Sequence, residues 1–143
     1  MALGEPVGGA ARTESEDWYE RAADQGHRRA QVRVGMLAAA RGDLAVAARW
    51  YREAAEAGSR NGAFNLGLLL AREGNEPEAA LWWTRAAVAG HGRAALRLGL
   101  LAARHGDLAE AQKWCVRAME LGPAEVSERA ARLREALAAE LSV

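Results

Sequence analysis

The 143-residue chain is poor in several residue types, and each shortage excludes a class of structure or site. It has one cysteine, Cys115, which excludes a disulfide framework and a cysteine metal cluster. It has one lysine, Lys113, against 18 arginines, a bias typical of a GC-rich bacterial genome. No apolar run approaches the ~18 residues that a membrane span requires. Acidic and basic residues are equal in number, 19 each, so overall charge does not favour nucleic acid or anionic membranes as partners.

The amino-terminal segment also lacks the features of an export signal. Residues 1–12 are mainly Gly, Ala and Pro, without a basic start followed by an apolar stretch. We therefore predict a flexible tail over residues 1–12 and a cytoplasmic protein.

Alanine and tryptophan, in contrast, dominate the rest of the chain. The 35 alanines, with many Leu, Glu and Arg residues, give a helical composition. Four tryptophans lie 32 residues apart, and the sequence around them repeats with the same period: Trp18, Trp50, Trp82 and Trp114. Such a period is typical of helix–turn–helix units that bury their apolar faces only by stacking. We therefore predict an all-α fold, a right-handed α-α superhelix of about three and a half repeats.

Glycines and capping residues place the helix boundaries. Gly26, Gly58, Gly90 and Gly122 follow the Trp-bearing helices, in the position where a left-handed residue ends a helix. Asp43, Asn75 and Asp107 follow the alternate glycines and are good N-caps. The repeat array should span residues 13–123, and a polar-backed capping helix should occupy residues 124–143. The predicted helices are 14–25, 28–41, 44–57, 60–73, 76–89, 92–105, 108–121 and 124–141.

The residues that most invite a chemical role have structural explanations. The tryptophans recur within alanine-rich helices, which favours packing between repeats over a platform for stacking bases. Cys115 takes the repeat position of Tyr51 and Trp83, which favours a buried core thiol. His27, His91 and His105 lie at turns without metal-ligand neighbours one helical turn away. No catalytic motif or phosphate-binding loop is present. We therefore predict no catalytic residue, no metal and no cofactor, and a protein that is not an enzyme.

One string within the repeat resembles a known family. Trp50, Tyr51, Ala54, Ala55 and Gly58, followed by Ala63, Leu66 and Gly67, are similar to the SEL-one-like repeat, a subclass of the tetratricopeptide superfamily. The resemblance covers about residues 14–123, although the connection between the paired helices is shorter than usual. It implies a curved binding scaffold whose concave side is lined by the helices at 28–41, 60–73 and 92–105. Some bacterial relatives are reported as hydrolases, but they are rich in cysteine, and this leaves a hydrolase as a remote alternative.

Aligning those three helices predicts a groove with arginine and asparagine at its rim and apolar side chains below. Residues four apart share a helix face, so equivalent positions form rows along the stack. No acidic residue occupies these rows. The polar rows are Arg29, Asn61, Arg93 and Arg33, Asn65, Arg97; the apolar rows are Val32, Phe64, Leu96 and Met36, Leu68, Leu100; Arg72 and Arg104 stand at the far edge.

This pattern predicts a protein-interaction module that binds a peptide or helix with acidic and apolar side chains. Asn65, Arg93 and Arg97 also resemble part of the clamp with which some tetratricopeptide domains grip a C-terminal carboxylate. The other part of that clamp is absent, because its positions hold Val32 and Met36. Two alternatives stay open: a homodimer in which the groove pairs with a second copy, or a groove that is covered by the C-terminal helix.

Overall fold

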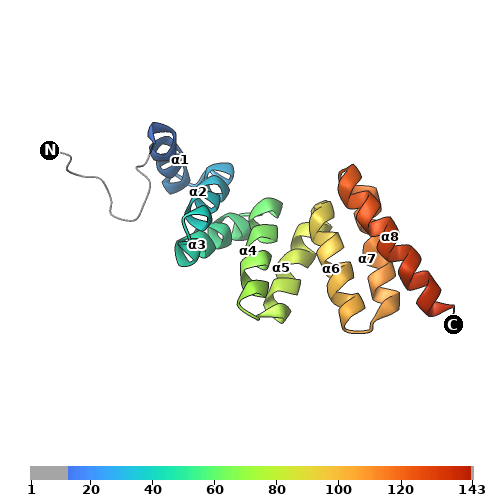
Figure 1. Ribbon diagram of the computed structural model, residues 1–143. Coiled ribbons are helices and arrows are strands. Elements are labelled where there is room, and N and C mark those ends of the chain that lie inside the picture. The colour runs from blue at the N-terminus through green and yellow to red at the C-terminus, as the bar shows by residue number, and fades with distance from the viewer. Residues whose placement is uncertain (1–12, 143) are drawn as a thin grey trace.

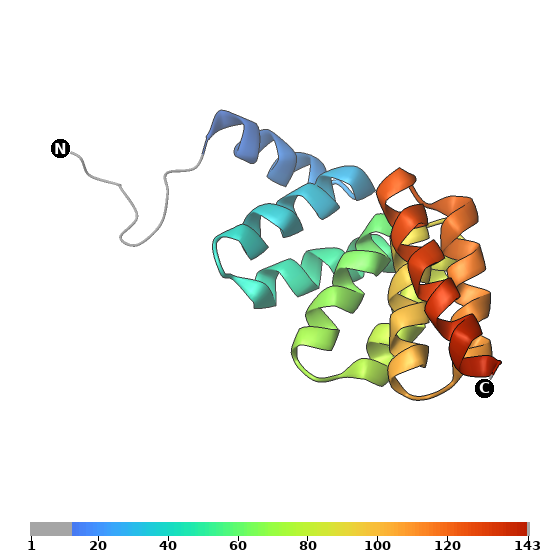
Figure 2. The same ribbon diagram turned by 45° about the vertical axis from the view of Figure 1, so that its right-hand side comes forward.

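The structure, a computed structural model, describes residues 13–142. Within that range the chain forms eight α-helices and no β-strand. Figures 1 and 2 show an elongated stack in which successive helices run antiparallel, with α1 and α8 at opposite ends. The tail predicted at residues 1–12 lies outside the described range. The helices are α1 (Glu14–Asp24), α2 (Arg28–Ala40), α3 (Leu44–Glu56), α4 (Arg60–Arg72), α5 (Glu76–Val88), α6 (Gly92–Arg104), α7 (Leu108–Leu121) and α8 (Ala124–Leu141).

The local signals of the sequence set the helix boundaries. All eight helices begin at the predicted residue, while the first six end one residue earlier than predicted. Side chains of Thr13, Asn75 and Asp107 accept hydrogen bonds from backbone N–H groups three residues further on, as N-caps do. Asp43 stands at the N-cap of α3 without such a bond. Each of the first six turns contains a glycine with φ between 80° and 102°, and this left-handed backbone lets the chain reverse within a few residues.

The prediction that Gly122 ends its helix in the left-handed region is wrong. Its φ of −81° and ψ of 161° are those of extended backbone. The reason is Pro123, because the ring of a proline disfavours helical conformations in the residue before it. The resulting turn lies against the start of α6, where a Cβ added at Gly92 would overlap Gly122.

The repeat consists of two helices that meet at a glycine. We call α2, α4 and α6 the A helices and α1, α3, α5 and α7 the B helices. A Cβ at Gly35 of α2 would lie 2.6 Å from Cε1 of Tyr51, and one at Gly67 of α4 would lie 2.5 Å from Cδ1 of Trp83. The glycine therefore makes room for the second aromatic residue of each Trp-Tyr or Trp-Trp pair. Trp83 also donates a hydrogen bond from Nε1 to the Phe64 carbonyl oxygen at 3.2 Å.

The periodic tryptophans differ in burial, which corrects the prediction that all four pack between repeats. Trp50 and Trp82 are 6% and 8% exposed, and Trp114 is half-buried. Trp50 packs with Ala23 of α1 and with Ala30 and Val34 of α2. Trp18 is 60% exposed, because the described residues contain no earlier repeat against which its indole could pack.

Two arginines link the A helix to the end of the B helix that follows it. Nη1 of Arg28, the first residue of α2, donates to the Ala57 carbonyl oxygen at the end of α3, over 2.9 Å. One period later, Arg60 makes the same bond to the Ala89 carbonyl oxygen at the end of α5, over 3.3 Å. A cation at a helix C-terminus satisfies a free carbonyl group and complements the helix dipole. These arginines therefore stabilise the stack and are not rim residues of the groove.

The carboxyl-terminal end of the stack is closed by α8. Val126, Ala130 and Leu137 are buried along one face of this helix. Leu137 packs with Ala111 and Cys115 of α7. Cys115 is fully buried, as its repeat position predicted, and burial raises the pKa of its thiol. This thiol is a packing group.

Candidate functional site

The A helices bound a groove along one side of the stack. A cavity of about 500 Å³ is lined by Asn65, Leu68 and Arg72 of α4, with Arg97 of α6. A second cavity of about 410 Å³ continues it along α6 to Leu100, Leu101 and Arg104. Both cavities are bordered by Ala71, Trp83 and Arg97. We call the two together the central groove.

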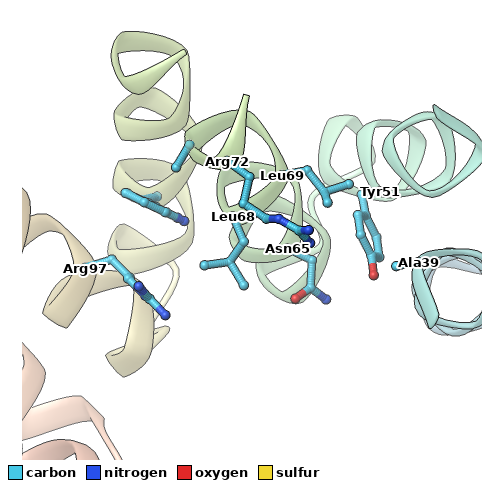
Figure 3. Close-up of a pocket in the computed structure, with 9 residues that line it drawn as sticks. Ala39, Tyr51, Asn65, Leu68, Leu69, Arg72 and Arg97 are labelled. Atoms are coloured by element: carbon cyan, nitrogen blue, oxygen red, sulfur yellow. The ribbon is translucent and has the colours of Figure 1, made fainter. Parts of the chain in front are cut away.

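Polar and apolar groups converge in the first of these cavities. Figure 3 shows Asn65, Leu68 and Arg72 projecting from α4 and Arg97 from α6, with Tyr51 on the far side. Arg72 and Arg97 form no ion pair with any carboxylate of residues 13–142. An unpaired guanidinium offers up to five N–H donors in a planar fork that matches a carboxylate. The cavity therefore presents two free cations beside an apolar surface.

Acidic residues do pair with two of the predicted groove arginines, from helices outside the aligned rows. Glu76, at the start of α5, forms ion pairs with both Arg104 and His105. Glu125 of α8 pairs with Arg93, with 2.7 Å between the carboxylate oxygen and the guanidinium nitrogen. The segregation of charge predicted from the rows thus holds for Arg72 and Arg97 and fails for Arg93 and Arg104.

The two predicted apolar rows differ in accessibility. Val32 and Leu96 belong to the main hydrophobic core and do not face the groove, which corrects their assignment as contact residues. Phe64, from the same row, is half-buried and stacks on His91 with ring centroids 4.4 Å apart. The row one turn further on is accessible, with Met36 46% and Leu100 36% exposed and Leu68 between them half-buried.

The remaining predicted residues lie apart from the central groove. Arg29 and Arg33 line a separate cavity of about 670 Å³ at the amino-terminal end of the stack, together with Tyr19. The Arg33 guanidinium lies 5.6 Å from the centroid of the Tyr19 ring, a cation–π contact. Asn61 and Arg93 line a shallow pocket of about 170 Å³ beside Gly90 and Pro123. The fourteen predicted residues therefore do not form one continuous site.

Among the groove residues that the sequence prediction missed are two aromatic residues and one acid: Tyr51, Trp83 and Glu76. The sequence pattern indicates only core positions for the aromatic pair, because these positions recur strictly and their neighbours are alanines. Tyr51 and Trp83 are in fact buried and also line the groove between the A helices. The signal that could have found them is the glycine of each A helix, since it brings the ring to the surface between two repeats. Glu76 has no comparable signal, because it precedes the repeating apolar pattern of α5.

Solved structures with the same architecture are known. A Sel1 repeat protein from Oxalobacter formigenes superposes with a TM-score of 0.70 at 27% sequence identity, over 79% of this chain. A protective antigen of uropathogenic Escherichia coli, c5321, displays an SLR fold and matches 94% of this chain, with a TM-score of 0.67 and 25% identity. Together with the W-Y-x-x-A-A-x-x-G string, these superpositions support a Sel1-like repeat fold for this chain.

The chain is similar to only a part of each of these structures. It spans 51% of the Oxalobacter protein and 35% of the Escherichia coli antigen. No family model and no curated protein matches the sequence. The comparisons therefore support a repeat scaffold as the architecture of this chain.

Within residues 13–142, no helix combines the length and the apolar character needed to cross a lipid bilayer. In the same range, no three His, Cys, Asp or Glu residues are grouped so that they could hold a metal ion.

One histidine of the shallow pocket that contains Asn61 and Arg93 has an unusual protonation equilibrium. His91 is the N-cap of α6, and its Nδ1 accepts a hydrogen bond from the Ala94 N–H at 3.1 Å. Burial, followed by the positive charges of Arg60 and Arg93, lowers the pKa of His91 from 6.5 to about 4. The imidazole is therefore neutral at pH 7 and is able to accept the capping hydrogen bond.

This protonation equilibrium makes stability depend on pH in a defined window. Below pH 6.5 the unfolded chain binds a proton at His91, while the folded chain does so only near pH 4. We expect the free energy of unfolding to decrease as pH falls through this window and the decrease to level off below about pH 4. His91→Asn keeps an N-cap acceptor and removes the titration, so denaturant unfolding should show a weaker pH dependence in this variant.

His27→Asn is the matched control, because His27 stands at the equivalent turn of the first repeat without a side-chain capping bond. An equal change of pH dependence in the two variants would contradict the role assigned to His91.

Proposed function

We propose that the central groove binds a peptide or helical segment of another protein that carries acidic and apolar side chains. The observation that supports this proposal most directly is the pair Arg72 and Arg97, which line one cavity of about 500 Å³ without a carboxylate partner in the described part of the chain. Arg104, the third arginine of the groove, already forms an ion pair with Glu76.

The chemistry of the groove matches such a ligand in two ways. Carboxylates of the ligand would accept charge-assisted hydrogen bonds from Arg97 and Arg72, with Asn65 able to donate a further bond from its amide. Apolar side chains of the ligand would contact Leu68 and Leu100, which are only partly buried in the free chain. Burial of that apolar surface provides affinity, and the arginines select for acidic residues.

A free C-terminus should not be required in the ligand. Of the residues that resemble a carboxylate clamp, Asn65 and Arg97 line the central groove, whereas Arg93 lines a different pocket and pairs with Glu125. The groove therefore lacks the Arg93 donor of such a clamp. Side-chain carboxylates of Asp and Glu residues within the ligand can accept hydrogen bonds from the remaining groove donors as well as a terminal carboxylate can.

Charge reversal at Arg97 tests the proposal. The probe is a panel of fluorescent peptides that alternate Leu with Glu, compared with peptides in which Lys replaces Glu. Arg97→Glu should weaken binding of the Leu/Glu peptides by about tenfold or more, since a hydrogen bond to a charged group contributes roughly 1.5–3 kcal/mol. Raising the salt concentration from about 0.05 to about 0.5 M should weaken the wild type as well, because exposed charges are screened.

Arg117→Glu is the matched control for this experiment. Arg117 is an exposed residue of the B helix α7, whose only ion pair in the described residues is a 3.8 Å contact with Glu120 one turn away. The variant makes the same change of net charge away from the groove and should leave affinity unchanged. If the two variants bound the Leu/Glu peptides equally well, the groove would not be the binding surface.

A further inference from the structure

A cavity of about 380 Å³ lies where α1, α2 and α3 meet, and it shares no lining residue with the central groove. Its wall combines two carboxylates with a buried amide and an indole ring. Among the residues that line it are Asp24 of α1, Gln31 of α2, and Arg49, Trp50 and Glu53 of α3. We propose that this cavity binds a guanidinium group, either an arginine side chain of a partner protein or a small guanidinium compound.

The amide of Gln31 has an acceptor oxygen without a donor. Gln31 is 5% exposed and is the only buried residue with an amide or charged side chain among residues 13–142. Its Nε2 donates a hydrogen bond to the Ala23 carbonyl oxygen at 3.3 Å, which fixes the orientation of the amide. Its Oε1 has no hydrogen-bond partner in the described part of the chain. A buried acceptor without a donor destabilises a fold, and a ligand N–H group that enters the cavity beside Gln31 would supply that donor.

The later repeats show that the fold does not require a glutamine at this position. The equivalent residues of α4 and α6 are Ala63 and Ala95, which are 3% and 0% exposed. An alanine therefore fits the same core position without an unsatisfied atom. Glu53 departs from the repeat in a similar way, because Arg85 and Arg117 hold its position in α5 and α7. Both departures lie in the wall of one cavity, and together they make it a site for hydrogen-bond donors.

The charge of the cavity favours a cation. Asp24 and Glu53 are exposed and form no ion pair with any residue of the range 13–142. Asp24 is also the last residue of α1, where the negative end of the helix dipole adds to its charge. Arg49 is the basic residue of the lining. Two carboxylates against one guanidinium leave one negative charge in excess.

Arg49 is engaged in a packing contact of the repeat. Its guanidinium lies over the Trp50 ring, 5.0 Å from the centroid. In the next repeat Arg85 covers the Trp82 ring in the same manner, at 4.7 Å. Arg49 therefore supplies the contact that Glu53 cannot make, since the residue equivalent to Arg85 is here an acid. The two carboxylates of the cavity are left without a cation of their own.

The acceptors of the cavity match a guanidinium better than an ammonium group. The Gln31 amide oxygen and the carboxylates of Asp24 and Glu53 come from three different helices, so a group that binds all of them must donate several hydrogen bonds. A guanidinium has five N–H donors, whereas an ammonium group has three. It is also less strongly hydrated, which lowers the cost of placing it beside the buried ring of Trp50.

An NMR titration of the ¹⁵N-labelled full chain tests the proposal. The probes are ethylguanidinium and a capped Gly-Gly-Arg-Gly-Gly peptide, and the same peptide with citrulline in place of arginine is the uncharged control. Both guanidinium probes should give saturable shifts of the Gln31 side-chain amide and of the backbone amides of Asp24 and Glu53. The citrulline peptide should bind about tenfold more weakly or not at all. Tighter binding of the arginine peptide than of ethylguanidinium would assign the site to a protein partner, and equal affinity would assign it to a small compound.

Two substitutions that introduce the residues of the later repeats should remove the site and keep the fold. Gln31→Ala removes the acceptor, and Glu53→Arg reverses a charge of the cavity. Each should weaken binding of the arginine peptide by about tenfold or more, with an unchanged circular-dichroism spectrum. The matched control is Glu56→Arg, because Glu56 is exposed on the same helix and does not line the cavity. Glu53→Gln removes the charge at nearly constant size and replaces Glu53→Arg if that variant fails to fold.

Three results would overturn the proposal. Absence of saturable shifts with either guanidinium probe would show that the cavity does not bind this group. Equal affinity for the arginine and citrulline peptides would show that the charge is not recognised. Unchanged affinity in Gln31→Ala, or equal effects of Glu53→Arg and Glu56→Arg, would mean that the cation is attracted to the acidic surface in general and does not enter the cavity.

Discussion

Replacing Gly67 by alanine is expected to lower the free energy of unfolding by about 1–3 kcal/mol, the range measured for overpacked cores. The new methyl group would lie 2.5 Å from Cδ1 of Trp83, whose ring is 5% exposed. Trp83 would have to move, and its hydrogen bond to the Phe64 carbonyl oxygen would be lost or strained. These costs exceed the gain of about 1 kcal/mol that alanine has over glycine inside a helix.

Gly99→Ala is the matched control, because the two glycines hold the same repeat position. At Gly99 the added methyl group would lie 3.4 Å from Sγ of Cys115, an ordinary contact distance. The helical preference of alanine should then dominate, and we expect unchanged or slightly increased stability. Denaturant unfolding of both variants measures the difference. Equal destabilisation would mean that the bulk of Trp83 does not determine the need for glycine.

This contrast shows how much of the fold the sequence could predict. The helix starts follow from local signals, the glycines and the capping residues Thr13, Asn75 and Asp107. A period of 32 residues then identifies the A and B helices, since equivalent positions repeat their environment. The period does not predict the backbone conformation at a position where a neighbouring residue differs from its equivalents in the other repeats. Gly122 follows the pattern of the earlier glycines in sequence, but the next residue, Pro123, changes its backbone conformation.

The groove was harder to predict than the fold, because its charges depend on contacts between different repeats. Aligning the A helices identifies the arginines, but it says nothing about residues that approach from a turn or from α8. Glu76 and Glu125 approach in this way and pair with Arg104 and Arg93. Burial of Val32 and Leu96 likewise depends on the angle between neighbouring A helices, which a helix-face argument for a single helix does not contain.

The arginines of this chain therefore differ in their hydrogen-bond and ion-pair partners. Arg28 and Arg60 are bound to carbonyl oxygens at helix ends, and Arg52 is bound to Glu78 on the outer face. Arg72 and Arg97 have neither kind of partner in the described residues. A charged group without a partner at a concave surface has most to gain from a ligand carboxylate. This distinction, more than the number of arginines, is what directs the proposed function to the central groove.

Trp82→Ala should destabilise the fold more than either glycine substitution, with a loss of about 3–5 kcal/mol, as for other aromatic-to-alanine changes in cores. Trp82 is 8% exposed and belongs to the main hydrophobic core together with Leu66 and Ala54. Its removal leaves a cavity at the junction of two central repeats. A repeat stack is stabilised mainly by contacts between neighbouring units, so a cavity at this junction weakens the whole array.

Trp18→Ala makes the same chemical change at the same repeat position and should cost less than about 1 kcal/mol, because most of the side chain is already in water. Trp18 is 60% exposed, and its ring contacts the guanidinium of Arg21 on the same helix. Thermal unfolding followed by circular dichroism compares the two variants. Equal losses of melting temperature would contradict the nearest-neighbour account of stability.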